Sequence, residues 1–111
     1  MPHLIIQHTQ KTASQMPDVC QAVFDAAAGC ATFPDATAIK VRSVLCANHT
    51  GGTGDDFAHV TVRLLDGRSD TEKADVSAAI MVALDRHLPT TANLTVEIVD
   101  MHRASYQKRS L

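Results

Sequence analysis

The stretch that decides the fold runs from Phe57 to Val99 and reads FAHVTVRLLDGRSDTEKADVSAAIMVALDRHLPTTANLTVEIV. Residues 57–65 predict a strand, which an Asp-Gly pair ends. Ser69 to Glu72 form a capping box, in which the serine and glutamate side chains satisfy free amides at a helix start. The helix ends before Pro89, and residues 94–99 alternate as a further strand. Apolar residues form one stripe along this helix: Val76, Ala79, Ile80, Ala83, Leu84 and Leu88.

The first half of the chain predicts the same order of elements. Residues 4–7 are an apolar run of strand length, residues 17–29 carry apolar side chains at helical spacing, and residues 38–46 alternate. Each crossover is long enough for the second strand to return parallel to the first by the right-handed route. We therefore expect an α+β fold, in which two βαβ units form a four-stranded sheet with both helices on one face.

Composition sets the class of protein. A chain of 111 residues with 45% hydrophobic and 20% charged residues fits a single domain over residues 1–111. A net charge of -2 without a dense Lys/Arg block argues against nucleic acid as a partner. No apolar run approaches the ~18 residues of a membrane span, so we expect no membrane partner and a cytoplasmic location. The odd set of Cys20, Cys30 and Cys46, without CxxC spacing, favours reduced thiols.

One sheet face is left uncovered in this architecture. We expect copies of the chain to bury it in a symmetric oligomer. The tail over residues 102–111 is polar apart from Tyr106, and it is predicted to be frayed or laid on a neighbouring subunit.

Two other features are weak indications of chemistry. The glycine-rich loop over residues 48–56 has no following Lys-Ser/Thr or helix, and Asp55 and Asp56 would repel phosphate, so it is predicted to be a connector or hairpin loop. The six histidines form neither an HxH nor an HExxH arrangement, so no metal site is expected.

The positions of three cationic residues are a stronger indication of a binding site. Lys40 and Arg42 alternate along a predicted strand and project from the same face, while Arg68 precedes a helix N-terminus whose free amides favour anions. Together they would bind a small molecule with more than one carboxylate. The alternative is that they are solvated surface charges.

The second residue offers a base. Removal of Met1 would leave Pro2 with a free secondary amine at the head of the first strand. Burial in an apolar pocket beside cations would lower the pKa of this amine towards neutrality. Pro2 is therefore a candidate general base.

Four stretches in this order and spacing carry a family resemblance: MPHLIIQHT (1–9), AIKVRSV (38–44), FAHVTVRLLDGRS (57–69) and VEIVDMHRASYQKRS (96–110). Together they resemble the 5-carboxymethyl-2-hydroxymuconate isomerase family of the tautomerase superfamily. The resemblance implies a homotrimer with active sites at subunit contacts, and neither a metal nor an organic cofactor. It also implies ketonisation of a 2-hydroxymuconate-type dienol to its conjugated 2-oxo isomer, in the bacterial breakdown of homoprotocatechuate.

The resemblance assigns roles to the candidate residues. Pro2 matches the family's catalytic base, and Arg68 matches the arginine of its G-R-S motif. Lys40 and Arg42 fall on an Arg-x-Arg pair, so these cations would bind carboxylates and stabilise a dienolate. Lysine at the first position is a point charge that orients a carboxylate less well than arginine, which leaves the substrate open. The alternatives are a protonated Pro2 acting as an acid in a hydratase, dehalogenase or decarboxylase, and a non-catalytic trimeric binding protein.

Overall fold

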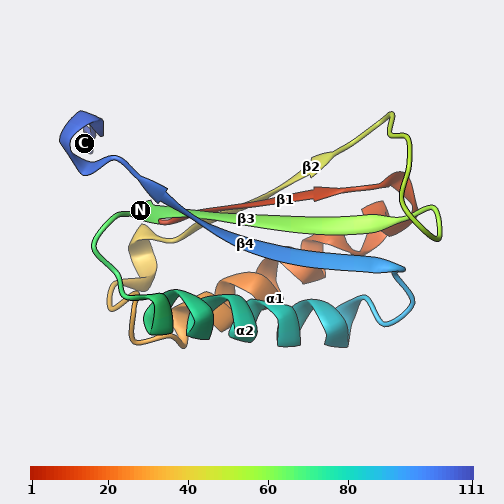
Figure 1. The fold of residues 1–111 in the computed structure, drawn as a ribbon, viewed down its shortest axis with the longest axis horizontal. Helices are drawn as coiled ribbons and strands as arrows, with labels where there is room; N and C mark the ends of the chain where they lie inside the picture. Colours follow the sequence, from red (N-terminus) through yellow and green to blue (C-terminus); the bar gives the residue numbers. More distant parts are fainter.

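Two helices cover one face of a four-stranded sheet in the computed structural model, which describes residues 1–111 (Figure 1). The strands and helices are β1 (His3–His8), α1 (Met16–Ala28), β2 (Lys40–Leu45), β3 (Phe57–Leu65), α2 (Asp70–His87) and β4 (Asn93–Met101). Short 3-10 turns occupy Gln10–Gln15, Ala36–Ala38 and Arg103–Ser105. None of the helices combines the length and the apolar composition that crossing a bilayer requires.

The sheet has the strand order β2-β1-β3-β4. β1 runs parallel to β2 and β3 runs parallel to β4, while β1 and β3 are antiparallel. The prediction of two βαβ units on one sheet is confirmed. The glycine-rich loop is a connector and not a hairpin loop, because β1 lies between the two strands that it joins.

The core lies between the sheet and the helices. Every second residue of β1 and β3 faces the helices, as the period of a strand requires. Fully buried side chains come from both layers: Leu4, Ile6, Val60, Val62 and Leu64 from the sheet, and Val19, Val23, Val76, Ile80 and Leu84 from the helices. Each contributes about 1.5–3 kcal/mol by leaving water. The predicted stripe of α2 is confirmed at its large residues, while Ala79 and Ala83 are half-buried.

The second strand starts later than predicted. The alternating pattern suggested a strand from residue 38, but Asp35 caps a 3-10 turn, in which its carboxylate accepts a hydrogen bond from the Thr37 amide at 3.0 Å. The turn delays β2 until Lys40. As a result, the side chain of Asp35 lies beside the N-terminus of the chain, with consequences for the site.

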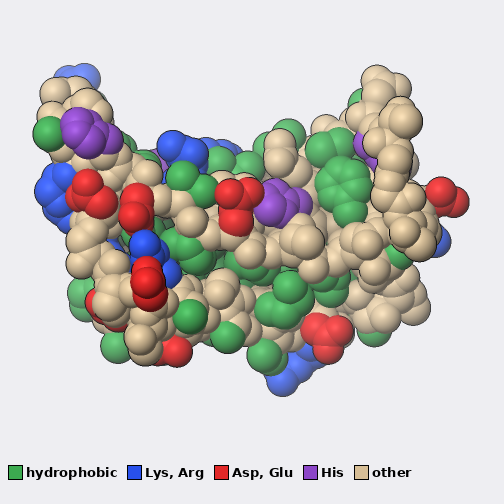
Figure 2. All heavy atoms as spheres, in the orientation of Figure 1, with side chains coloured by type: hydrophobic (Ala, Val, Ile, Leu, Met, Phe, Trp, Pro, Cys, Tyr) green, Lys and Arg blue, Asp and Glu red, His purple; other side chains and the backbone are tan.

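The sheet face away from the helices is not covered by any part of the chain (Figure 1). Figure 2 shows this side as a concave surface between two projections. By comparison with Figure 1, these are the C-terminal segment and the connection between β2 and β3. We call this surface the open face.

Candidate active site

A cavity of about 170 Å³ opens at the N-terminal end of β1. Pro2 is buried in its wall, and Phe33 and Leu64 supply apolar surface. The Pro2 carbonyl accepts a hydrogen bond from the Lys40 amide at 3.1 Å, which extends the pairing of β1 with β2 by one step. A proline is tolerated here because a residue at the start of a strand does not have to donate a backbone hydrogen bond to the neighbouring strand. The fold thus mounts Pro2 rigidly at the edge of a small, mainly apolar space.

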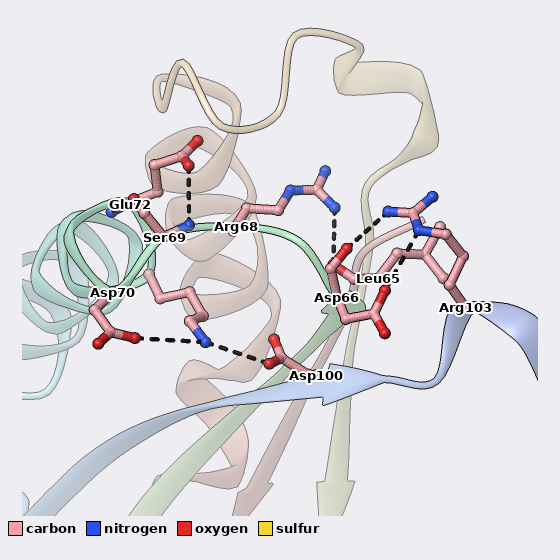
Figure 3. Close-up of polar contacts among 9 residues, drawn as sticks. Leu65, Asp66, Arg68, Ser69, Asp70, Glu72, Asp100 and Arg103 are labelled. Carbon is pink, nitrogen blue, oxygen red and sulfur yellow. Dashed lines mark hydrogen bonds and ion pairs between the residues drawn. The ribbon is translucent and has the colours of Figure 1, made fainter.

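Arg68 is the cation that shares this cavity with Pro2. It follows Gly67, whose φ of 113° is costly for any residue with a side chain, and it precedes the capping box of α2. Its Nη1 donates a hydrogen bond to the Leu65 carbonyl at 3.0 Å (Figure 3). The other guanidinium N–H groups make no hydrogen bond within the chain and are available for a carboxylate. Pro2 and Arg68, which are far apart in the sequence, therefore line the same cavity.

Asp35 belongs to the candidate site as well, and it was not among the residues predicted from the sequence. It lines the same cavity, and its carboxylate accepts hydrogen bonds from the Thr37 amide and hydroxyl at 3.0 and 2.6 Å. These bonds lower the pKa of Asp35, so it is charged at neutral pH. An aspartate that caps a turn is typical of the Asp-x-Thr pattern, which was the available signal.

The N-terminal amine lies in a field of opposing charges. In the full chain it belongs to Met1 and donates a hydrogen bond to the Ala38 carbonyl. Its pKa is lowered by burial and then by the positive charges of Lys40 and Lys108, whereas Asp35 acts to raise it. While Met1 is present, the Pro2 nitrogen is an amide without a basic lone pair. The same charges surround the position that a Pro2 amine would occupy.

Lys40 and Arg42 lie outside this cavity. Both are exposed and project from the open face, as the alternation along β2 predicts. Lys40 Nζ donates to the Ala38 carbonyl at 3.4 Å, and Arg42 Nη1 donates to His3 Nδ1 at 3.2 Å. Burial and then the positive charges of Arg42 and Lys40 lower the pKa of His3, which therefore stays neutral and accepts this bond. Within one chain, the four candidate residues are thus split between the cavity and the open face.

Solved structures share this fold. A 5-carboxymethyl-2-hydroxymuconate isomerase from Deinococcus radiodurans R1 is 20% identical with a TM-score of 0.83, over 99% of this chain and 90% of that one. A fused wild-type 4-OT protein that forms a symmetric trimer is 19% identical with a TM-score of 0.75, over 92% and 87%. The FG41 malonate semialdehyde decarboxylase, inhibited by 3-bromopropiolate, is 18% identical with a TM-score of 0.71, over 94% and 86%.

Sequence comparison decides the family. No curated protein matches the chain by sequence, and the solved structures are too distant to show more than the fold. The family model for 5-carboxymethyl-2-hydroxymuconate isomerase matches residues 2–110, which is nearly the whole chain and includes all four candidate residues. The chain belongs to the 5-carboxymethyl-2-hydroxymuconate isomerase family.

Proposed function

We propose that the protein is a cofactor-independent keto–enol tautomerase of 5-carboxymethyl-2-hydroxymuconate-like unsaturated 2-hydroxy carboxylates, with the Pro2 amine as general base. The observation that carries this proposal is the position of Pro2, which is buried in a mainly apolar cavity that Arg68 also lines, with guanidinium N–H groups left over from its bond to Leu65. Membership of an isomerase family supports the reaction class. Breakdown of homoprotocatechuate in bacteria is the proposed setting.

The chemistry needs only the residues of the chain. The Pro2 amine takes the proton from the enol oxygen of the substrate, and the resulting negative charge spreads along the conjugated system to the distal carbon. A cation held near the oxygen stabilises this dienolate, a role that Arg68 is placed to fill. The protonated amine then delivers the proton to the distal carbon. The product is the conjugated 2-oxo isomer, and the amine returns to its starting state.

We infer that the working unit is a homotrimer in which open faces meet. The open face places Lys40 and Arg42 where a second subunit would pack, and the fused 4-OT relative with this fold is a symmetric trimer. Packing of this kind would bring these cations to a site at the subunit contact. They would then bind carboxylates of the substrate there.

The decisive experiment is ketonisation of 2-hydroxymuconate and its 5-carboxymethyl analogue by protein shown by intact mass to lack Met1. Pro2→Ala should lower turnover by at least ~100-fold, the usual contribution of a general base, while circular dichroism and oligomeric state are unchanged. Preparations that retain a fraction of Met1 are the matched control, because their activity should scale with the Met-free fraction. Near wild-type turnover by Pro2→Ala would refute the mechanism.

The second candidate is a protonated Pro2 that serves as a general acid. Asp35 lines the Pro2 cavity and acts to raise the pKa of the amine, against the lowering by burial, Lys40 and Lys108. The decarboxylase relative shows that this fold also occurs in lyases. Titration of the ¹⁵N-labelled Pro2 nitrogen separates the candidates, because a base must be largely neutral at the pH of activity and an acid must be protonated.

A further inference from the structure

The C-terminal segment forms a second hollow beside the candidate active site. Its volume is about 230 Å³, and it lies between the head of β1 and residues 106–110. Met1, His3 and Lys40 line one side of it. Met1 also lines the Pro2 cavity, so the two spaces adjoin at the N-terminal residue and would join when that residue is removed.

The second hollow is lined by positive charge. Lys40, Lys108 and Arg109 contribute to its wall, and no carboxylate does. Lys108 makes no ion pair or side-chain hydrogen bond within the chain. It lies near enough to the N-terminal amine for its charge to lower the pKa of that group. An anion would therefore find an unpaired ammonium group here.

The segment is held in place at its root. Arg103 Nη2 donates to the Asp66 carbonyl at 2.8 Å, and Arg103 Nε lies 3.4 Å from the Asp66 carboxylate (Figure 3). The carbonyl of the neighbouring residue, Leu65, accepts the hydrogen bond from Arg68. One turn after β3 thus positions both the cation in the Pro2 cavity and the start of the C-terminal segment.

We propose that the C-terminal segment is a wall of the substrate site, and that Lys108 is a further substrate-binding residue that takes a second carboxylate. This inference rests on the proposed function and adds a residue that would bind one of the carboxylates of its substrate. The first carboxylate is bound in the Pro2 cavity by Arg68, and the second lies in the adjoining hollow, across the N-terminal residue. A substrate with two or more carboxylates, such as those proposed above, would span both spaces.

The test compares binding of adipate and hexanoate, which have the same number of carbons but carry two carboxylates and one. Isothermal titration calorimetry on the full-length, Met-free protein measures both dissociation constants. Lys108→Ala should weaken adipate by about 10-fold, as expected for one charge-assisted contact, and change hexanoate by less than about twofold. The matched control is Lys11→Ala, which removes the same charge from an exposed residue beyond the other end of β1.

Two results would overturn the inference. If Lys108→Ala weakened the binding of adipate and of hexanoate equally, Lys108 would not bind a second carboxylate. If it left the affinity for adipate unchanged, the C-terminal segment would not be part of the substrate site. Arg103→Ala should weaken adipate in the same direction by loosening the segment, and Arg103→Lys should restore part of the loss. Calorimetry measures binding and not turnover. If Pro2→Ala kept near wild-type turnover, the tautomerase mechanism would be refuted, but the adipate and hexanoate affinities would still test the role of Lys108.

Discussion

At the scale of single residues, the proposed function depends on the protonation of one amine. Burial and then the charges of Lys40 and Lys108 lower the pKa of the N-terminal amine and favour its neutral form, whereas Asp35 favours the charged form. A general base works only when it is neutral, so under the proposed mechanism these side chains would set the pH at which activity begins. Lys40 and Asp35 are therefore predicted to have opposite effects on the pH–rate profile.

Asp35→Asn should move the ascending limb of the pH–rate profile to lower pH, because the pKa of the Pro2 amine falls when a nearby negative charge is removed. Lys40→Met should move the limb to higher pH, because removing a positive charge raises that pKa. Steady-state rates between pH 5 and 9 measure both shifts. Asp55→Asn is the control in the distant loop, where asparagine tolerates the φ of 67°. Limbs that coincide in all four proteins would exclude an electrostatic role for both residues.

At the scale of elements, the turn between β3 and α2 is the most informative part of the chain. The Ser69 hydroxyl accepts from the Glu72 amide at 3.1 Å, and the Glu72 carboxylate accepts from the Ser69 amide at 3.0 Å (Figure 3). The hydrogen bonds from Ser69 lower the pKa of Glu72, which therefore stays charged. Its negative charge stabilises the helix by interacting with the positive end of the helix dipole. The cap defines where α2 begins, and with it the position of Arg68.

Ser69→Ala should lower the free energy of unfolding by about 1 kcal/mol, the usual cost of losing a serine N-cap. Urea unfolding followed by circular dichroism measures the change. The matched control is Ser77→Ala inside α2, which should be neutral or stabilising because alanine is the better helix former and Ser77 only donates to the Ala74 carbonyl at 3.0 Å. A loss at Ser77 as large as that at Ser69 would contradict the capping argument.

At the scale of the whole molecule, the open face is suited to being covered. Val44, which lies on this face of β2, is 43% exposed. One group of polar side chains on this face already has partners, since the ring nitrogens of His59 lie 2.6 Å from Thr95 Oγ1 and from Glu97 Oε2. Polar groups that are hydrogen-bonded can be buried at low cost. Packing against another copy would therefore gain apolar burial without leaving these groups unsatisfied.

Val44→Glu should convert the proposed trimer to folded monomers, because it places a charge in the proposed contact without touching the core. Analytical ultracentrifugation measures the mass, and circular dichroism checks the fold. Val82→Glu is the matched control, since Val82 is 59% exposed on α2, on the other side of the molecule. A trimer that survives Val44→Glu would place the subunit contact elsewhere, as would a trimer lost in Val82→Glu.

The sequence by itself determined the elements and the way they connect. Strand period, helix period and the capping box act between residues that are close in the chain, so β3, α2 and their order could be predicted directly. The same local reasoning identified Pro2 and Arg68 as chemically suited residues, and the family model over residues 2–110 agrees with the resemblance.

Only the tertiary structure decided which residues share a space. A cavity forms where distant segments meet, and no local period records which side chains will line it. Asp35 reaches the Pro2 cavity because a capped turn delays β2, and Lys108 reaches the N-terminus because Arg103 ties the C-terminal segment to the turn after β3. The separation of Arg42 from Arg68 likewise follows from the two faces of the sheet, which exist only once the strands have paired.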